Sequence, residues 1–248
     1  PRSSPATVRA RPVTGNERPA TRMKRRRFPK DRFPWRGHNR LQLLRDGDVF
    51  FPRMLAAIAD ARHYVLLEMY LFESGRVADR FIDALMAAAR RGVRVHLLLD
   101  HFGSLGLARH DRARLRQAGV MALFYNPLHL GKWFNNFARD HRKLLLVDGS
   151  RAFVGGVGIT DDFDPVQHAQ KRWRETMVEM QGPVVADWQA LFTSVWNQHA
   201  DEPMQPLTPA PPLLEQGARA RVILSAGLLR QEGKRMLLRN LRAGGGTA

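Results

Sequence analysis

The chain has 248 residues, of which 44% are hydrophobic, enough for one sizeable α/β domain with tails. Its 40 lysines and arginines outnumber 23 aspartates and glutamates, giving a formal net charge of +17. This charge predicts an anionic partner: a nucleic acid, an anionic lipid surface or a phosphate-bearing substrate. Because cysteine is absent, a disulfide framework and a thiolate nucleophile are excluded. No apolar run is long enough to span a bilayer, so we expect no transmembrane helix.

The first segment, residues 1–38, contains mainly Pro, Ser, Arg and Thr and shows no hydrophobic period. This composition predicts a disordered basic tail. A run of four basic residues at 24–27 either contacts anionic headgroups or belongs to a solvated tail.

The next segment alternates between helical and strand patterns. Apolar residues at helical spacing follow a turn at 46–48 and predict helices at 49–61, 77–91 and 108–118. Short apolar runs predict buried strands at 64–72, 93–100 and 120–125. This alternation predicts an α/β fold with a mixed, largely parallel sheet flanked by helices on both faces.

The second half of the domain begins with two short apolar runs, 142–147 and 152–157. Asp148 and Gly149 stand between them, and an Asp-Gly pair there predicts a hairpin. A further strand is predicted at 176–181 and a helix at 183–199. We assign residues 39–202 to this domain.

The last segment, residues 203–248, starts with a Pro-rich linker at 203–217. A short strand at 221–225 and a helix at 232–242 are predicted after it. A linker, a strand and a helix normally introduce another domain. We therefore expect the opening of a truncated second domain; whether the chain is a processed product or a fragment of a longer gene stays open.

One group of residues, at 141–148, has side chains suited to catalysis. On a strand, His141 and Lys143 project from the same face, and Arg142 points to the other. A neutral imidazole is a competent nucleophile near neutral pH. A neighbouring lysine stabilises the charge that builds on the oxygens of a phosphodiester, without a metal or another cofactor. Asp148 falls at the turn, where its carboxylate can accept hydrogen bonds.

Two glycines, Gly155 and Gly156, end the next predicted strand. Their missing side chains are expected to let a phosphate approach the backbone. His141, Lys143, Gly155 and Gly156 are thus the expected phosphate-binding residues. The histidines of the sequence lack metal-ligand spacing, so no metal site is expected.

The run HRKLLLVD at 141–148, followed by the glycine pair, resembles the HKD signature of the phospholipase D superfamily. Further segments resemble the bacterial cardiolipin synthase branch: 45–61, 66–72, 87–104 and 173–196. The similarity covers residues 41–200, with a weaker echo as far as 242. It implies a phospholipase D-like domain at 39–202.

The resemblance also implies roles for single residues. His141 would be one of two active-site histidines, either the nucleophile or the general acid, and Lys143 would bind the phosphate. Asp148 would mainly hold the turn of the motif. Glu175 matches a carboxylate that orients an active-site imidazole; the alternative is a surface partner of Arg172 or Arg174.

Two buried carboxylates have open roles. Glu68 and Asp100 lie in or at the end of predicted strands, where they line the cleft or support the structure. A structural role is favoured for Asp100, and both roles stay open for Glu68.

The sequence departs from the family pattern in two ways. Gly158 stands where the family usually has Asn, which removes an amide from the phosphate site. A second H-x-K-x4-D motif does not follow residue 148, although family sites use two. The partner motif is therefore expected from another chain, as in a homodimer, or from sequence that is absent here.

The leading interpretation is a phosphatidyltransferase of the cardiolipin synthase type that works through a phosphohistidine. Its substrate would be an anionic phospholipid such as phosphatidylglycerol. The protein would be peripheral, on the cytoplasmic face of the bacterial inner membrane. Trp133, Phe134 and Phe137 would either dip into the membrane surface or form a packed loop.

Two alternatives remain. The first is a homodimeric HKD phosphodiesterase or nuclease, which the positive charge favours and the cardiolipin synthase-like segments disfavour. The second is an inactive truncated half that binds anionic lipid or a partner chain.

Overall fold

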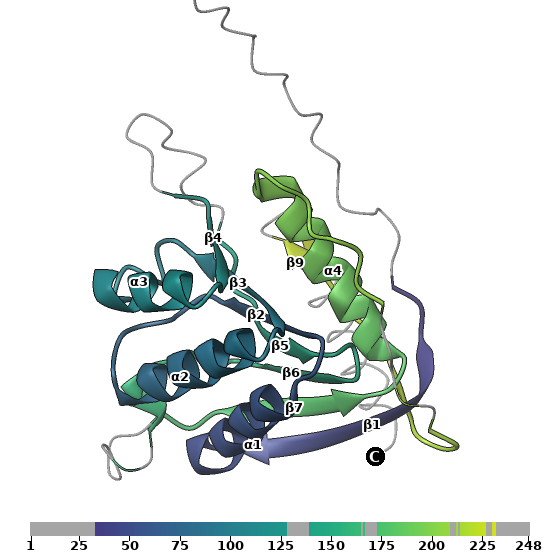
Figure 1. The fold of residues 1–248 in the computed structure, drawn as a ribbon. Helices are drawn as coiled ribbons and strands as arrows, with labels where there is room; N and C mark the ends of the chain where they lie inside the picture. Colours follow the sequence, from purple (N-terminus) through teal and green to yellow (C-terminus); the bar gives the residue numbers. More distant parts are fainter. Residues whose placement is uncertain are drawn as a thin grey trace, which may run out of the picture.

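The computed structural model describes residues 33–127, 139–164, 166, 173–208, 212, 214–226, 230 and 231 (Figure 1). Its elements, in chain order, are β1 Arg36–Arg45, α1 Gly47–Asp60, β2 Tyr64–Met69, α2 Arg76–Arg90, β3 Arg94–Asp100, α3 Arg109–Gln117, β4 Met121–Tyr125, β5 Lys143–Val147, β6 Arg151–Gly155, η2 Asp161–Phe163, β7 Thr176–Gln181, α4 Val184–His199, β8 Ala218–Ala220, β9 Ser225–Ala226 and β10 Arg230–Gln231. Within these residues, no helix is long and apolar enough to cross a bilayer.

The main sheet has eight strands in the order β4-β3-β2-β5-β6-β7-β1-β8. This arrangement confirms a mixed α/β fold with helices on both faces, but the expectation of a largely parallel sheet is wrong. Only the β2–β3 and β3–β4 pairs are parallel, and the other five neighbouring pairs are antiparallel. Parallel neighbours need a crossover, and only α2 and α3 supply one between adjacent strands.

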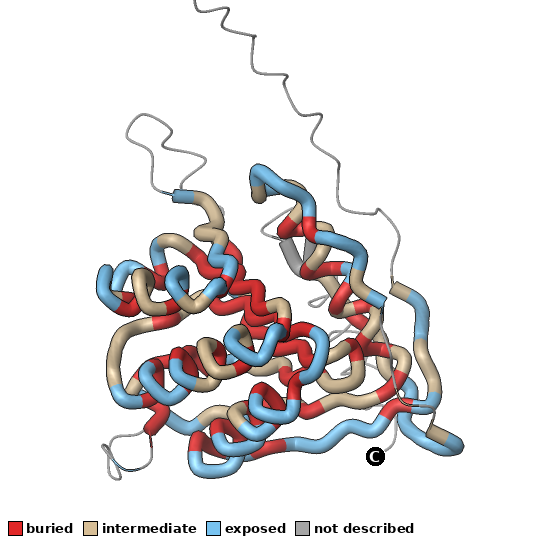
Figure 2. Tube along the Cα trace, in the orientation of Figure 1, coloured by how far each residue is buried: buried red, intermediate tan, exposed pale blue. Residues whose placement is uncertain are grey.

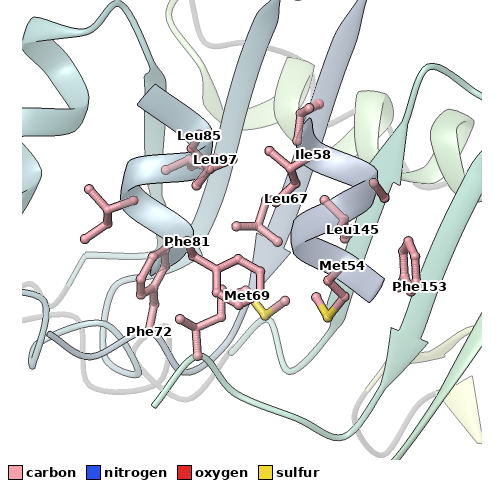
Figure 3. Close-up of a cluster of buried hydrophobic side chains, with 14 of the residues drawn as sticks. Met54, Ile58, Leu67, Met69, Phe72, Phe81, Leu85, Leu97, Leu145 and Phe153 are labelled. Carbon is pink, nitrogen blue, oxygen red and sulfur yellow. The ribbon is translucent and has the colours of Figure 1, made fainter. Parts of the chain in front are cut away.

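Strands β2, β3, β5, β6 and β7 send alternate side chains to two cores, one under α1 and α2 and one under α4. Buried residues accordingly concentrate along the central strands in Figure 2. Figure 3 shows the first core, where α1 and α2 cover β2, β3, β5 and β6; its members include Met54, Ile58, Phe81, Leu85, Leu67, Leu97, Leu145 and Phe153. In β5, Leu145 faces this core and Leu144 faces the core under α4.

The β5–β6 hairpin forms as predicted. Val147 pairs with Arg151 across the turn. Asp148 and Gly149 both adopt left-handed backbone, with φ of 51° and 61°. Asp and Gly tolerate this conformation, which explains why this dipeptide is a good hairpin signal.

Strand β1 was missed, and it begins at Arg36, inside the expected tail of residues 1–38. In its ten residues only Asn39 and Leu44 are buried, whereas Leu41 and Leu43 are exposed, so no buried apolar face marks the strand. The strand is held by its neighbours: it pairs with β7 on one side and β8 on the other. Residues 1–32 of the expected tail lie outside the described residues.

The expected linker packs on the domain. The backbone N–H of Met204 donates to Asn197 Oδ1 at 2.7 Å, and Gln189 Nε2 donates to the carbonyl of Leu207 at 3.1 Å. Met204 and Val222 are buried in the core under α4. In place of a strand at 221–225 there are β8, which extends the main sheet, and the β9–β10 pair. The predicted helix at 232–242 lies outside the described residues.

Candidate functional site

The site lies at the edge where the parallel strands β2 and β3 end and β5 begins. The β2–β5 register pairs Met69 with Lys143, and the β6–β7 register pairs Gly155 with Met177. This edge therefore collects most of the residues that the motif predicts: His141, Lys143, Gly155, Gly156 and Glu175. Ligands of α/β sheets bind outside the carboxyl ends of strands, at a change of strand order.

His141 and Lys143 contact each other. Lys143 Nζ lies 3.1 Å from His141 Nδ1 and donates a hydrogen bond of 2.9 Å to the carbonyl oxygen of His141. The ammonium is buried, with Lys143 only 6% exposed, whereas His141 is exposed. An imidazole that solvent reaches thus sits on a nearly enclosed cation.

Burial lowers the pKa of Lys143 to about 8, although the nearby carboxylates of Asp140, Glu175 and Asp100 act to raise it. Burial, and then the charge of Lys143, lower the pKa of His141. Near neutral pH, Lys143 is therefore largely an ammonium and His141 largely a neutral imidazole. An ammonium only donates hydrogen bonds, so Nδ1 is the acceptor and we assign the ring proton to Nε2.

The glycine pair leaves room for the start of β7 and for the carboxylate of Glu175, the residue before it. A Cβ on Gly156 would lie 2.1 Å from Glu175 Oε2, and one on Gly155 would lie 2.7 Å from the carbonyl oxygen of Thr176. The absence of these two side chains therefore serves packing within the chain. Phosphate contact at the exposed Gly156 stays a prediction.

Glu175 is held at the edge of the site by hydrogen bonds to two backbone N–H groups. Its Oε1 accepts a hydrogen bond of 2.8 Å from the N–H of Thr176, and its carbonyl accepts one of 2.9 Å from Asp46. Arg174, which was considered as its surface partner, pairs instead with Asp46 at 2.8 Å. Arg172 lies outside the described residues. The charge of Glu175 reaches Lys143, where it acts to raise the lysine pKa.

Gly158 is buried against Leu71, which follows β2 in the chain. A Cβ at this position would lie 2.9 Å from Leu71 Cβ. The amide side chain that the family usually carries there has no space unless Leu71 moves. Gly158 therefore suits the packing of Leu71 in this chain.

Asp148 lies at the other end of β5, five residues from Lys143 and so roughly 16 Å along the strand. Its carboxylate accepts three backbone hydrogen bonds of 2.8 Å, from Arg62, His63 and Tyr64. These bonds attach the hairpin turn to the start of β2. We therefore interpret Asp148 as a scaffold residue, distant from the substrate.

Behind His141, on the α4 side of the sheet, Arg142 lies between two carboxyl groups. It is 2.7 Å from Glu68 Oε1 and 3.0 Å from Asp140 Oδ1. Burial raises the pKa of Glu68 well above its usual value. Burial also acts to raise the pKa of Asp140, but the hydrogen bonds of Glu68 and Arg142 outweigh it and lower that pKa. These shifts favour a proton on Glu68 and a charge on Asp140, and with the positive Arg142 that arrangement has no net charge.

Asp100 accepts backbone hydrogen bonds that fit the structural role favoured from the sequence. Its Oδ1 accepts hydrogen bonds from the N–H groups of Phe102 and Gly103, at 3.0 and 3.2 Å. Its Oδ2 accepts one of 2.9 Å from the N–H of Asp140. Asp100 therefore ties the end of β3 to the residue that precedes His141.

Among the described residues, no three His, Asp or Glu side chains are grouped to hold a metal ion. Trp133, Phe134 and Phe137, proposed as membrane contacts, lie outside the described residues. One site residue was missed: Tyr70, whose ring faces His141 and Lys143. The sequence places it within an apolar run, where nothing distinguishes it from a core aromatic.

Comparison with solved structures identifies the fold. Nuc from Salmonella typhimurium, a phospholipase D family member, superimposes with a TM-score of 0.50 at 20% identity, covering 67% of this chain and 99% of Nuc. Phosphatidylserine synthase from Haemophilus influenzae Rd KW20 superimposes with a TM-score of 0.53 at 12% identity, covering 68% and 39%. The described domain thus has the phospholipase D fold.

Sequence comparison identifies the family. The profile described as cardiolipin synthase, PLD-like domain, matches residues 54–196, so the chain belongs to this family. Cardiolipin synthase B of Salmonella typhimurium is 37% identical over 155 residues, 62% of this chain and 37% of that protein. Cardiolipin synthase of Geobacillus kaustophilus is 31% identical over 229 residues, 90% of this chain and 44% of that protein. The chain therefore spans less than half the length of these relatives.

Proposed function

We propose that this chain supplies one half of the active site of a phosphatidyltransferase that makes cardiolipin. The observation that carries the proposal is the contact between His141 Nδ1 and Lys143 Nζ at an open sheet edge, in a member of the cardiolipin synthase family. The family supplies the substrate class, an anionic phospholipid such as phosphatidylglycerol.

The proposed reaction has two steps. An imidazole nitrogen forms a bond to the phosphorus of phosphatidylglycerol, the bond to glycerol breaks, and the glycerol oxygen takes a proton from a second imidazole. The hydroxyl of another phosphatidylglycerol then attacks the phosphohistidine, passing its proton to the second imidazole. Cardiolipin leaves and the first histidine is restored.

Lys143 binds the non-bridging phosphate oxygens and stabilises the charge that builds on them. Its burial supports this role, because a poorly solvated ammonium interacts strongly with an incoming anion. No metal is required in this scheme.

The proton position bears on the role of His141. Proton donation through Nε2 keeps the contact only if Nδ1 takes a proton from the Lys143 ammonium at the same time, because a neutral imidazole is otherwise too weak an acid. Attack through Nε2 requires the ring proton to move to Nδ1, and Lys143 must leave Nδ1 for this; a phosphate oxygen that takes over the hydrogen bond of the ammonium would permit both changes. Substrate binding would then prepare His141 for attack.

The second histidine would come from another copy of the chain or from a further part of the full-length protein. The shares of 37% and 44% that the chain covers in its relatives leave room for such a part. We place the protein at the cytoplasmic face of the bacterial inner membrane, held peripherally by its positive charge of +17.

The test is lipid conversion without metal. The chain, as a dimer or within the full-length protein so that the second histidine is present, is incubated with phosphatidylglycerol vesicles in EDTA, and cardiolipin and glycerol are measured by mass spectrometry. The proposal expects both products from the wild type and neither from His141→Ala. Cleavage of plasmid DNA without cardiolipin would assign the chain to the nuclease alternative, and vesicle binding without either reaction would assign it to the inactive half.

A further inference from the structure

Tyr70 stands directly after β2, where its ring faces both members of the reactive pair. Its centroid lies 4.4 Å from that of His141, with the rings tilted by 46°. Lys143 Nζ lies 4.9 Å from the same centroid. An aromatic face attracts an ammonium at this distance, and it also excludes water from the contact.

The backbone that carries Tyr70 is fixed on two sides. Phe72 donates a hydrogen bond of 3.3 Å to the carbonyl of Gly103, and Ile159 donates one of 2.9 Å to the carbonyl of Leu71. A Cβ on Gly103 would lie 2.0 Å from the carbonyl oxygen of Tyr70, so the two segments pack closely. The ring therefore stands on a rigid support between the loops after β3 and β6.

The rest of the surroundings does not hold the ammonium in place by direct bonds. In the described part of the chain, the hydrogen bonds of Lys143 Nζ both go to His141. The carboxylates of Asp140, Glu175 and Asp100 act on Lys143 through their charge. A long lysine side chain loses much conformational freedom when it is held in one place, so a further contact is needed to keep it there.

We propose that Tyr70 is a positioning residue that holds the Lys143 ammonium on His141 Nδ1 and so keeps the ring proton of His141 on Nε2. The proposal rests on the proposed function only in taking this pair as the reaction centre. The aromatic face is what acts: it covers one side of the imidazole and attracts the ammonium. The phenolic hydroxyl is not required.

The test reads the proton directly. Histidine labelled with nitrogen-15 gives separate signals for Nδ1 and Nε2 in the purified chain, and His141→Gln identifies the signals of residue 141. In the wild type and in Tyr70→Phe, the signals of neutral His141 should show the proton on Nε2. In Tyr70→Leu they should show a mixture of both tautomers, and the pKa of His141 should rise by at least about half a unit as solvent reaches the ring.

Signals of His96 and His199 serve as the control, because both rings pack elsewhere, against Trp196 and Tyr125. If they move in Tyr70→Leu, the fold has changed, and Tyr70→Met replaces this variant with an unbranched side chain. The proposal is overturned if the tautomer and pKa of His141 are unchanged in the folded variant. It is also overturned if Tyr70→Phe behaves like Tyr70→Leu.

A second readout is turnover of phosphatidylglycerol. We expect Tyr70→Leu to lower kcat about tenfold, with KM nearly unchanged, because an ammonium that the ring no longer holds is also misplaced for the charge that builds on the phosphate oxygens. Absence of turnover in the wild type would count against the proposed function, and the nuclear magnetic resonance signals would still decide the role of Tyr70.

Discussion

The three motif residues lie at the two ends of β5, and the charged groups at these ends are in opposite surroundings. At one end, the Lys143 ammonium is buried, its pKa is lowered to about 8, and its neighbour His141 is exposed. At the other end, the Asp148 carboxylate accepts three backbone hydrogen bonds. A carboxylate whose lone pairs already accept hydrogen bonds from fixed donors has little capacity to bind a substrate, whereas a poorly solvated ammonium attracts an anion strongly. The motif thus divides into a reactive end and a scaffold end.

The largest expected effect is at the reactive end. His141→Ala should lower turnover of phosphatidylglycerol about 10³- to 10⁴-fold, because it removes proton transfer or the nucleophile. The unfolding free energy should change by less than about 0.5 kcal/mol, since the side chain is exposed. His63→Ala is the matched control, an exposed histidine at the scaffold end that gives Asp148 only its backbone N–H. Equal losses in both variants would contradict the division.

Lys143→Met should lower turnover about 10²- to 10³-fold, because it removes the cation that stabilises developing charge. Stability should not fall, since an apolar side chain of similar length replaces a buried ammonium. Urea denaturation measures this together with the turnover. A variant that unfolds easily and keeps its turnover per folded molecule would place Lys143 in the scaffold instead.

Asp148→Ala should lower the unfolding free energy by about 3 kcal/mol, because three backbone donors lose a charged acceptor and Ala is strained at positive φ. Asp148→Asn should cost less, since Asn tolerates this backbone and keeps one oxygen. Turnover per folded molecule should stay within about threefold of the wild type. A loss of turnover as large as in His141→Ala would mean that Asp148 takes part in the reaction.

The pH dependence separates the ends further. Turnover should fall about tenfold per pH unit above about 8, as the Lys143 ammonium loses its proton. Lys143→Arg keeps its charge, so its alkaline decline should move to higher pH even where its maximal rate is lower. The unfolding free energy should change in the opposite direction to turnover as the pH rises. The folded pKa of Lys143 is lowered, so the unfolded chain binds more protons and stability rises from pH about 8 to about 10.5. A decline that stays in place in Lys143→Arg would assign it to another group.

The smallest effect is expected for Glu68, one of the two carboxyl groups that flank Arg142. Glu68→Gln should change the unfolding free energy by less than about 1 kcal/mol, because burial favours the protonated form of this carboxyl. Asp140→Asn should cost more, about 3 kcal/mol, since it removes the ionised partner of buried Arg142. Thermal or urea unfolding of both variants measures the difference, and a reversed order would show that Asp140 carries the proton.

The helices and strands that the sequence predicts best are those with a strong local pattern. Helices α2, α3 and α4 and the β5–β6 hairpin all form within a few residues of their predicted bounds. Strand β1 has no such pattern, because it is set by its neighbours β7 and β8. The direction of most strand pairs was also missed, since it depends on how distant segments meet.

The site follows the same rule. Strand alternation predicts that His141 and Lys143 share a face, and their contact confirms it. The pairing of Glu68 with Arg142, and the place of Tyr70, follow from the β2–β5 register, which sets Met69 opposite Lys143. No local pattern contains that register, because it joins segments about 75 residues apart.

The most direct measurement is cardiolipin formation from phosphatidylglycerol in EDTA by the wild type, Lys143→Met and Asp148→Asn, divided by the folded fraction of each protein. The division of β5 predicts product from the wild type and from Asp148→Asn, and a loss of at least about 10²-fold in Lys143→Met. Cardiolipin formation by Lys143→Met at the wild-type rate would contradict it.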